Sequence, residues 1–521
     1  MSLQTHVAEL PAADMSYQRQ LWRRLVIPPF DSWVALALGC LVLPFSYGAD
    51  NIALAAWLSP VFLLRFVRTQ RWRIAMPVLF VAEMAAAAFQ LRGMFPVTGA
   101  EYWVLLIVGT VPALIPYAVD RALARKLHGL TATLVFPVTW TVMDYLNAFG
   151  PYGSWGAAAY SQYGQLALMQ IVSVTGLWSI SFLIGWFASV CNLLWEEGWK
   201  SRSATRAAFG FGAVISLVLL AGGLRLVLFT PTSPTVRIAS LSAAHSAKTP
   251  DSLEKLAFGK ASSDDLKQIH DWTRKVNDDL LERADRAAEA GAKIIFWAEG
   301  NASVLKQDEP ALLAEGARLA VKHQVYLGMA LAVWTPGAAR VLENKLVMLK
   351  PDGTIAWQYI KANPVPGDEA AWSVTSDGKL PSIKTPYGIL STAICFDADF
   401  PQTLAQAGAL NADIVLNPSN DWSGIDPWHT QMASFRAVEQ GISIIHQASH
   451  GLSAAFDYEG NRLSAMDYFH GDDSDMISDV PTEGVRTLYS RLGDWFAWAC
   501  GAALLAVVLR VLVSRTRISH T

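Results

Sequence analysis

The chain has 521 residues, of which 52% are hydrophobic and only 16% are charged. Soluble proteins of this size carry about 25% charged residues, so the composition indicates a membrane protein. The net charge of −3 at pH 7 gives no electrostatic reason to expect a nucleic-acid partner. The composition is also uneven: residues 30–230 are mostly apolar, residues 235–490 have the composition of a globular domain, and the last stretch is apolar again.

The apolar stretches predict membrane-spanning helices, because a helix needs roughly 20 mostly apolar residues to cross a bilayer. We expect such helices near residues 31–48, 51–65, 74–91, 102–120, 130–148, 165–195, 206–229 and 494–513. The predicted domains are a cytoplasmic segment 1–30, a membrane domain 31–230 with seven helices, a globular domain 235–487, an eighth helix 494–513 and a cytoplasmic tail 514–521.

The distribution of Lys and Arg predicts the orientation, because short cytoplasmic loops are enriched in these residues. Basic residues gather in every second connection and at both ends, namely Arg19, Arg23 and Arg24; Arg65, Arg68, Arg71 and Arg73; Arg121, Arg125 and Lys126; Lys200, Arg202 and Arg206; and Arg510, Arg515 and Arg517. Both termini are therefore expected in the cytoplasm. The globular domain would then lie on the outer face of the cytoplasmic (inner) membrane, which is the periplasmic face in a cell with two membranes.

Strands and helices alternate in the globular domain. Apolar runs predict strands at 236–241, 293–297, 325–333 and 388–394, and residues 264–290 predict a helix with one apolar face. The turn 351–353 separates two further strands and predicts a hairpin. Because hairpins interrupt the alternation, the sequence favours an α/β domain of two mixed sheets with helices outside.

Cys395 is the only cysteine of the globular domain, since Cys40, Cys191 and Cys500 fall within predicted spans. A lone thiol in an oxidising compartment cannot form an internal disulfide. Cys395 is therefore either incidental or a nucleophile.

Two other predicted strands end in charged residues, Glu299 and Lys361. A carboxylate in a dry pocket can act as a general base toward a thiol. A lysine can hold the thiolate and stabilise an oxyanion, together with a backbone N–H such as that of Phe396. With Cys395, these residue types suit acyl transfer through a thioester.

Glu299, Lys361 and Cys395, in this order and each at a strand end, resemble the catalytic triad of the nitrilase (carbon–nitrogen hydrolase) superfamily. The segments 417–422, 427–432 and 436–441 also resemble motifs of its membrane-embedded branch, the apolipoprotein N-acyltransferases. The resemblance covers nearly the whole chain. It implies a multi-span α-helical membrane domain joined to an α-β-β-α sandwich.

The resemblance also implies the activity and the site. Glu299 would be the general base, Lys361 the oxyanion stabiliser, Cys395 the nucleophile, and Glu369 the second glutamate of the family. A phospholipid would donate the acyl chain, and the N-terminal amine of a diacylglyceryl-modified lipoprotein would accept it, with no metal or cofactor. The residues expected around the pocket or in auxiliary roles are Phe396, Trp297, Asn420, Asp421 and Trp422, whereas His429 and His446 are expected to be structural.

Some segments depart from the family pattern. Residues 297–299 are W-A-E where the family usually has W-P-E, residues 395–397 are C-F-D in place of a C-Y-E-like run, and residues 370–386 form a short, polar arm. These departures allow a divergent member: a membrane-tethered amidase or acyltransferase whose acceptor is water or another amine. A non-catalytic membrane module is a third hypothesis.

Overall fold

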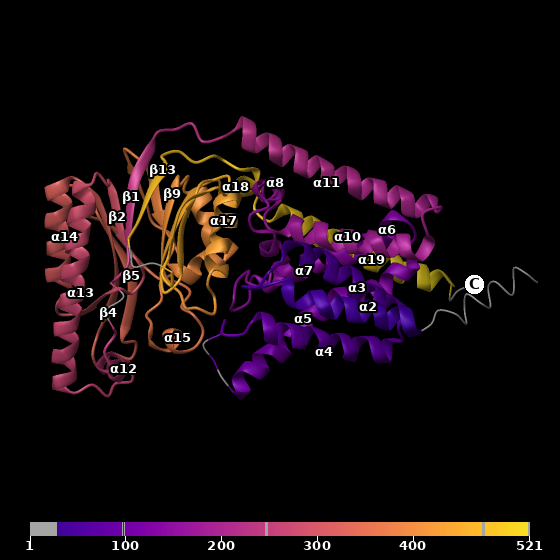
Figure 1. Cartoon of the computed structure of the whole chain (residues 1–521), viewed down its shortest axis with the longest axis horizontal. Helices are drawn as coiled ribbons and strands as arrows, with labels where there is room; N and C mark the ends of the chain where they lie inside the picture. The colour runs from indigo at the N-terminus through magenta and orange to yellow at the C-terminus, as the bar shows by residue number, and fades with distance from the viewer. Residues whose placement is uncertain (1–28, 96, 98, 245–247, 471–474, 519–521) are drawn as a thin grey trace, which may run out of the picture.

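The computed structural model describes residues 29–518, with gaps at 96, 98, 245–247 and 471–474. Most of the predicted segment 1–30, with Arg19, Arg23 and Arg24, lies outside the described residues, as do residues 519–521. The molecule has a helical part and a part built on β-sheets, placed end to end along its longest axis (Figure 1).

The helical part is a bundle whose long helices run roughly along that axis (Figure 1). Its long helices are α2 (Pro29–Val42), α3 (Ala53–Thr69), α4 (Trp72–Gln90), α5 (Ala100–Leu123), α7 (Val135–Asn147), α10 (Trp178–Glu197), α11 (Arg202–Leu228) and α19 (Trp495–Ile518). Short turns of helix connect them: η1 (Leu43–Phe45), η2 (Ala124–Lys126), α6 (Leu130–Thr133), η3 (Ala158–Gln162), α8 (Leu166–Met169) and α9 (Val172–Thr175).

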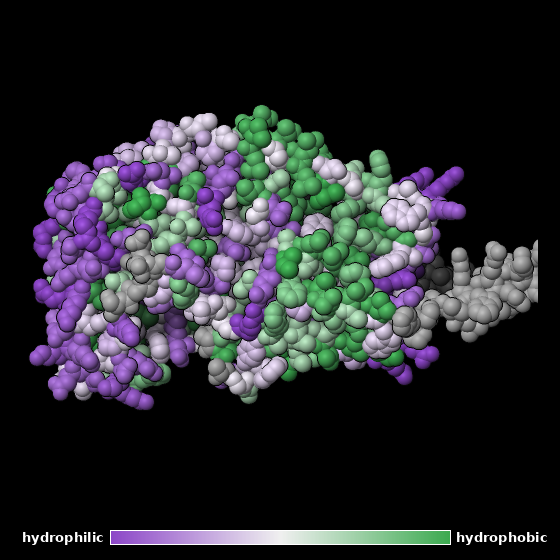
Figure 2. Space-filling view, in the orientation of Figure 1, coloured by the Kyte–Doolittle hydropathy of each residue, from purple (hydrophilic) through white to green (hydrophobic). Residues whose placement is uncertain are grey.

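Apolar side chains cover the visible face of the bundle, whereas the sheet part is largely hydrophilic (Figure 2). Among the described residues, five helices are long and apolar enough to cross a membrane: Trp72–Gln90, Ala100–Lys126, Trp178–Glu197, Arg202–Leu228 and Trp495–Val513. The eight-span topology and its domain boundaries stay a prediction.

The predicted span 165–195 is not one continuous helix. Residues 166–175 form the short helices α8 and α9, and the long helix α10 begins only at Trp178. The break falls at Gly176, whose φ of +70° favours glycine, and a Cβ there would lie 2.5 Å from Cε2 of Tyr489. The close packing of Tyr489 on a glycine backbone therefore sets where α10 starts.

Two sheets form the other part. The seven-stranded sheet has the order β13-β1-β2-β4-β5-β6, with β3 paired to β4, and the six-stranded sheet has the order β12-β11-β10-β9-β8-β7. The strands of the first sheet are β1 (Thr235–Leu241), β2 (Ile294–Trp297), β3 (Ala302–Leu305), β4 (Tyr326–Trp334), β5 (Leu342–Leu349), β6 (Ile355–Ile360) and β13 (Asp475–Pro481). Those of the second are β7 (Ser382–Thr385), β8 (Gly388–Thr392), β9 (Ile414–Asn420), β10 (Ser443–Ser449), β11 (Leu452–Phe456) and β12 (Arg462–Asp467).

Both sheets are mixed. β1, β2 and β4 run parallel, whereas β4, β5 and β6 are antiparallel. β8, β9 and β10 run parallel, with antiparallel neighbours outside them. In parallel neighbours the carboxyl ends meet at one edge, which is where ligands bind in α/β sheets.

Helices cover the outer faces of the two sheets. α13 (Ser263–Glu289) and α14 (Glu309–His323) lie outside the first sheet, and α17 (Trp428–Gln440) lies on the side of the second sheet toward the bundle (Figure 1). α16 (Pro401–Ala409) packs against α17. Buried residues of both sheets, such as Phe296 and Leu416, form the core between them. The predicted fold class, a helical membrane domain joined to an α-β-β-α sandwich, is confirmed. The remaining short helices are α12 (Asp251–Ala257), η4 (Cys395–Asp399), α15 (Asp368–Trp372) and α18 (Leu488–Leu492).

A buried polar network joins the sandwich to the bundle. The guanidinium of Arg436 in α17 pairs with Glu439 and donates hydrogen bonds to Tyr160 Oη and, over 2.7 Å, to Ser154 Oγ. Ser154 N–H donates to the carbonyl of Asp399 over 2.9 Å. Because buried charges must be paired and hydrogen-bonded, these contacts fix the loop 148–163 against the sandwich.

Candidate active site

Three strand ends converge at the edge of the sandwich. Glu299 follows β2, Lys361 follows β6, and Cys395 opens the turn η4 after β8. All three are buried, with exposed fractions of 4%, 2% and 3%. Cys395 has a φ of +48°, a left-handed conformation that non-glycine residues adopt at a cost and that is common at functional sites. The structure therefore brings together the three residues that the sequence predicted as a catalytic set.

Lys361 lies between two carboxylates. Its Nζ donates to Glu299 Oε1 over 2.7 Å and to Glu369 Oε1 and Oε2 over 2.8 and 3.0 Å. Burial alone would lower the pKa of Lys361, but Glu299 and Glu369 outweigh it and hold that pKa well above its usual range. Lys361 is therefore an ammonium ion in the resting site, and Glu369 lies where the family resemblance placed a second glutamate.

Asn344 is a member of this cluster that sequence reasoning missed. Its Nδ2 donates to Glu299 Oε1 over 2.6 Å and to Glu369 Oε1 over 3.1 Å. The available signal was a polar side chain within the mostly apolar strand β5. Asn344 holds both carboxylates in place, which leaves fewer rotamers open to Glu299.

The Cys395 thiol is neutral in the resting site. Burial raises its pKa well above the usual range, and the carboxylate of Glu299 raises it further. Lys361 and the backbone N–H of Asn420, which donates to the sulfur, act in the opposite direction. Only the thiolate is a strong nucleophile, so the thiol needs a base beside it.

Asp397 ties the cysteine turn to the end of β6. Its carboxylate accepts hydrogen bonds from Tyr359 Oη at 2.8 Å, Asn363 N at 2.8 Å, Asn363 Nδ2 at 2.9 Å and Ala362 N at 3.2 Å. Burial raises the pKa of Asp397 to about 6. Both carboxylate oxygens of Asp397 therefore accept hydrogen bonds, and Asp397 positions Cys395 relative to Lys361.

Asp397→Ala is expected to destabilise the protein and to lower its activity. The substitution leaves the buried Tyr359 hydroxyl and two partly buried backbone N–H groups without an acceptor. A buried polar group without a partner costs about 1–3 kcal/mol. Thermal unfolding in detergent measures this loss. Tyr359→Phe, which removes only one donor, is the matched control and is expected to cost about 1 kcal/mol. Equal melting temperatures for the two variants would contradict this role.

Cys395 lines two different pockets. The apolar pocket lies toward the bundle and is lined by Met94, Phe95, Val97, Leu105, Tyr152, Trp155, Val365, Pro366, Cys395, Phe396, Trp422, Ile425 and His429. The polar pocket lies within the sandwich, and its lining includes Asp251, Glu254, Glu299, Ser303, Asn344, Lys361, Asp368, Glu369, Trp372, Cys395, Asn420 and Trp422. The thiol therefore stands at the junction of an apolar and a charged space.

Of the residues predicted to surround the pocket, some line one of the two pockets and one lies in the hydrophobic core. Phe396 lines the apolar pocket, Asn420 the polar one and Trp422 both, with Trp422 Nε1 donating to the carbonyl of Gly93 over 2.8 Å. Trp297, in contrast, is fully buried in the hydrophobic core. It supports the strand that carries Glu299.

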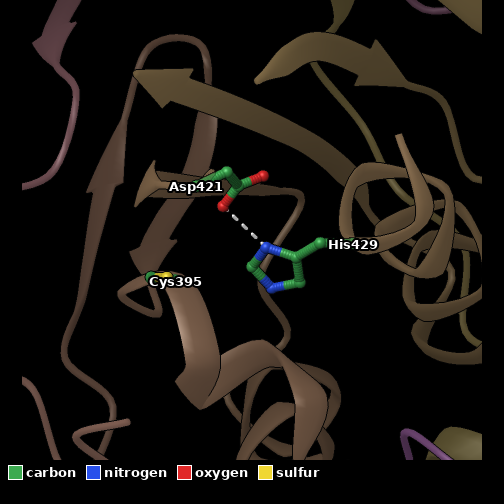
Figure 3. Close-up of side chains that lie close together, drawn as sticks. All are labelled: Cys395, Asp421 and His429. Carbon is green, nitrogen blue, oxygen red and sulfur yellow. Dashed lines mark hydrogen bonds and ion pairs between the residues drawn. The ribbon is translucent and has the colours of Figure 1, made fainter. Parts of the chain in front are cut away.

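His429 lies at the thiol. Figure 3 shows the Asp421–His429 pair beside Cys395, and the sulfur, a ring nitrogen and a carboxylate oxygen of the three lie within 4.8 Å of one another. His429 was expected to be structural, because the sequence has no second ligand at metal-binding spacing and the predicted triad needs no metal. Its position comes from the packing of α17 against η4, the turn that begins with Cys395. His446 lies behind Asp421, with Nδ1 2.6 Å from Asn417 Oδ1.

Two parts of the chain match known families. Residues 261–471 match the family described as carbon-nitrogen hydrolase, and residues 38–190 match the family described as apolipoprotein N-acyltransferase N-terminal domain. A protein of Geobacter metallireducens named apolipoprotein N-acyltransferase is 25% identical, covering 96% of this chain and 99% of its own. A protein of the same name from Bradyrhizobium diazoefficiens is 26% identical over 77% of each chain. An amidase from Nesterenkonia sp. aligns with a TM-score of 0.38 and 19% identity, covering 48% of this chain and 92% of that one.

The sandwich is thus a carbon–nitrogen hydrolase domain, and the molecule is a membrane-associated member of that superfamily. With both family models matched in order and relatives aligned along most of its length, the chain belongs to the apolipoprotein N-acyltransferase family.

Proposed function

We propose that the protein transfers a fatty acyl chain from a phospholipid, through a thioester on Cys395, to the N-terminal amine of a diacylglyceryl-modified lipoprotein. The observation that carries this proposal is the position of Cys395, a buried thiol between an apolar pocket toward the bundle and a charged pocket that holds Glu299 and Lys361. An acyl chain needs the first environment, and proton transfer needs the second.

In the first half-reaction Glu299 takes the thiol proton, and the thiolate of Cys395 attacks the carbonyl carbon of the phospholipid ester. The new C–S bond forms as the carbonyl oxygen becomes an oxyanion, which the Lys361 ammonium and a backbone N–H such as that of Phe396 stabilise. When this intermediate collapses, the C–O bond breaks and the lysophospholipid leaves with the proton that Glu299 held. The acyl group stays on the sulfur as a thioester.

In the second half-reaction a neutral amine attacks the thioester carbon. Glu299 accepts one proton from the attacking nitrogen, the C–S bond breaks, and the proton passes to the departing thiolate. The products are an amide and the free enzyme. The same carboxylate therefore serves as base and then as acid in both halves, and no metal or cofactor enters the balance.

The charges of the polar pocket favour an amine acceptor over water. Five carboxylates line it, those of Asp251, Glu254, Glu299, Asp368 and Glu369, against the ammonium of Lys361. Such an excess of negative charge in a cleft raises the local concentration of cations. An N-terminal ammonium is drawn toward it and releases one proton to the solvent before it attacks as a neutral amine, whereas a neutral water molecule is not drawn in. This supports N-acyl transfer in preference to hydrolysis.

We further propose that eight helices cross the inner membrane, with both termini in the cytoplasm and the sandwich on the outer face. The basic connections support this orientation. Arg71 lies between α3 and α4, Arg125 follows α5, and Lys200 lies between α10 and α11. These connections lie at the end of the bundle away from the sandwich (Figure 1). Both amphiphilic substrates would then approach from the outer leaflet.

The proposal predicts a mass increase of one fatty acyl group when the purified protein is incubated with a defined phospholipid. Intact-protein mass spectrometry detects the adduct, and its removal by hydroxylamine identifies a thioester. Adding a synthetic peptide with an N-terminal diacylglyceryl-cysteine should then discharge the enzyme and yield the N-acylated peptide. The same peptide with an acetylated amine is the matched control and should leave the adduct in place.

The outcomes separate the parts of the proposal. An adduct that only water or simple amines discharge would keep the thioester and overturn the lipoprotein acceptor. Absence of any adduct, in a sample whose thermal unfolding shows it to be folded, would overturn the acyl-enzyme itself.

A further inference from the structure

His429 is held between two buried carboxylates on the apolar side of the thiol. Its Nδ1 lies 2.8 Å from Asp421 Oδ1 and its Nε2 lies 3.2 Å from Asp399 Oδ2. The imidazole is 3% exposed and stacks on Trp155 with ring centroids 5.8 Å apart. Ionised carboxylates only accept hydrogen bonds, so both ring nitrogens carry protons and the ring is an imidazolium.

The chemical environment agrees with this protonation state. Burial alone would lower the pKa of His429, but Asp421 and Asp399 hold it well above its usual range. His446 behaves differently, because burial lowers its pKa and its Nδ1 faces the amide oxygen of Asn417. The charged and titratable groups that face the cluster are Cys395, Asp399, Asp421 and His446, and beyond Asp399 also Tyr47, Tyr160 and Arg436.

The position of the imidazolium matters because the reaction forms a negatively charged thiolate on Cys395, close to the carboxylate of Asp421. Asp421 lies near the sulfur and raises the pKa of the Cys395 thiol. Lys361 lowers the pKa of the thiol, but its ammonium already forms ion pairs with Glu299 and Glu369. Without the charge of His429, a thiolate would form close to the Asp421 carboxylate, and two negative charges in low-dielectric surroundings repel each other strongly.

We propose that His429 is a positioning residue that holds a fixed positive charge beside Cys395, neutralises Asp421 and Asp399 there, and so permits the thiolate to form in a buried, apolar setting. This inference rests on the proposed role of Cys395 as nucleophile. It adds a second cation beside the thiol: His429 lines the apolar pocket, whereas Glu299 and Lys361 line the polar one. His429 touches no reacting atom of the substrate in this scheme.

The test is the pH dependence of Cys395 alkylation by iodoacetamide, measured on the full-length protein in detergent and localised to Cys395 by peptide mass spectrometry. His429→Gln should slow alkylation on the order of tenfold at each pH below the inflection, and should move the inflection to higher pH, since tenfold corresponds to one pKa unit. His429→Gln combined with Asp421→Asn removes both charges and should recover most of the rate. His446→Asn is the matched control and should leave the profile unchanged.

Asp399→Asn gives an independent test with the opposite sign. It removes one carboxylate while Asp421 still holds the ring, so alkylation should become faster and its inflection should move to lower pH. A wild-type profile in both His429→Gln and Asp399→Asn would overturn the proposal, even if His429→Gln also lowered stability. Alkylation requires neither acyl donor nor acceptor, so this result is independent of whether acyl transfer occurs.

Discussion

Replacing Cys395 by alanine is expected to abolish acyl transfer and the acyl-enzyme adduct together. Loss of a catalytic nucleophile lowers rates by on the order of a million-fold, and no other thiol of the described residues lines either pocket. Stability should change by only about 1 kcal/mol, because alanine fills most of the same space. Intact-protein mass spectrometry and N-acylation of the diacylglyceryl-cysteine peptide measure both consequences.

Cys40→Ala is the matched control for this experiment. Cys40 lies in α2 and is exposed on the surface of the bundle. This variant should form the adduct at the wild-type rate. An adduct that persists in Cys395→Ala and disappears in Cys40→Ala would contradict the assignment of the nucleophile.

Lys361→Met should damage both activity and stability. The substitution leaves the buried carboxylate of Glu299 and the partly buried carboxylate of Glu369 without a cation, and breaking a buried ion pair costs about 3–5 kcal/mol. It also removes a stabiliser of the oxyanion, which lowers the rate about 100- to 1,000-fold. The two effects are separated by measuring the adduct formed per folded molecule and, on the same sample, the melting temperature.

Lys345 offers a control of the same kind away from the thiol. It is a buried lysine in β5 that pairs with Glu309 over 2.6 Å and with Glu343 over 2.8 Å. Lys345→Met should therefore lose comparable stability while each folded molecule keeps its activity. If Lys361→Met and Lys345→Met lost activity equally, Lys361 would be a structural residue. Lys361→Met combined with Glu369→Gln should recover stability but not the rate.

Sequence reasoning could predict the strand-end residues because each stands directly after an apolar run. The order of strands and helices brings such ends to one edge, so Glu299, Lys361 and Cys395 could be expected to meet. Glu369 was found through the family resemblance, and it lies on the ammonium of Lys361. The fold class could also be predicted from local patterns, because strands alternate with helices and hairpins interrupt that alternation.

The remaining parts of the site depend on packing between segments far apart in the chain. His429 reaches Cys395 because α17 packs against η4. Asn344 reaches Glu299 because β5 lies in the same sheet as β2, with only β4 between them. The helix break at Gly176 depends on the ring of Tyr489, more than 300 residues later. No local pattern in the sequence reports these neighbours. The short edge strands β7 and β12 were missed because their exposed, polar residues resemble loops.

Through the loop 148–163, the helical bundle forms part of the wall of the candidate active site and also anchors the sandwich. Trp155 supplies a wall of the apolar pocket and a face for His429, and Ser154 and Tyr160 accept hydrogen bonds from the buried Arg436. A shortened chain of residues 235–487 would therefore lose an active-site wall and leave an arginine without its acceptors. Recombination between relatives would have to transmit this loop together with residues 395–440. We therefore expect the two halves of the chain to function only together, although their folds are of different classes.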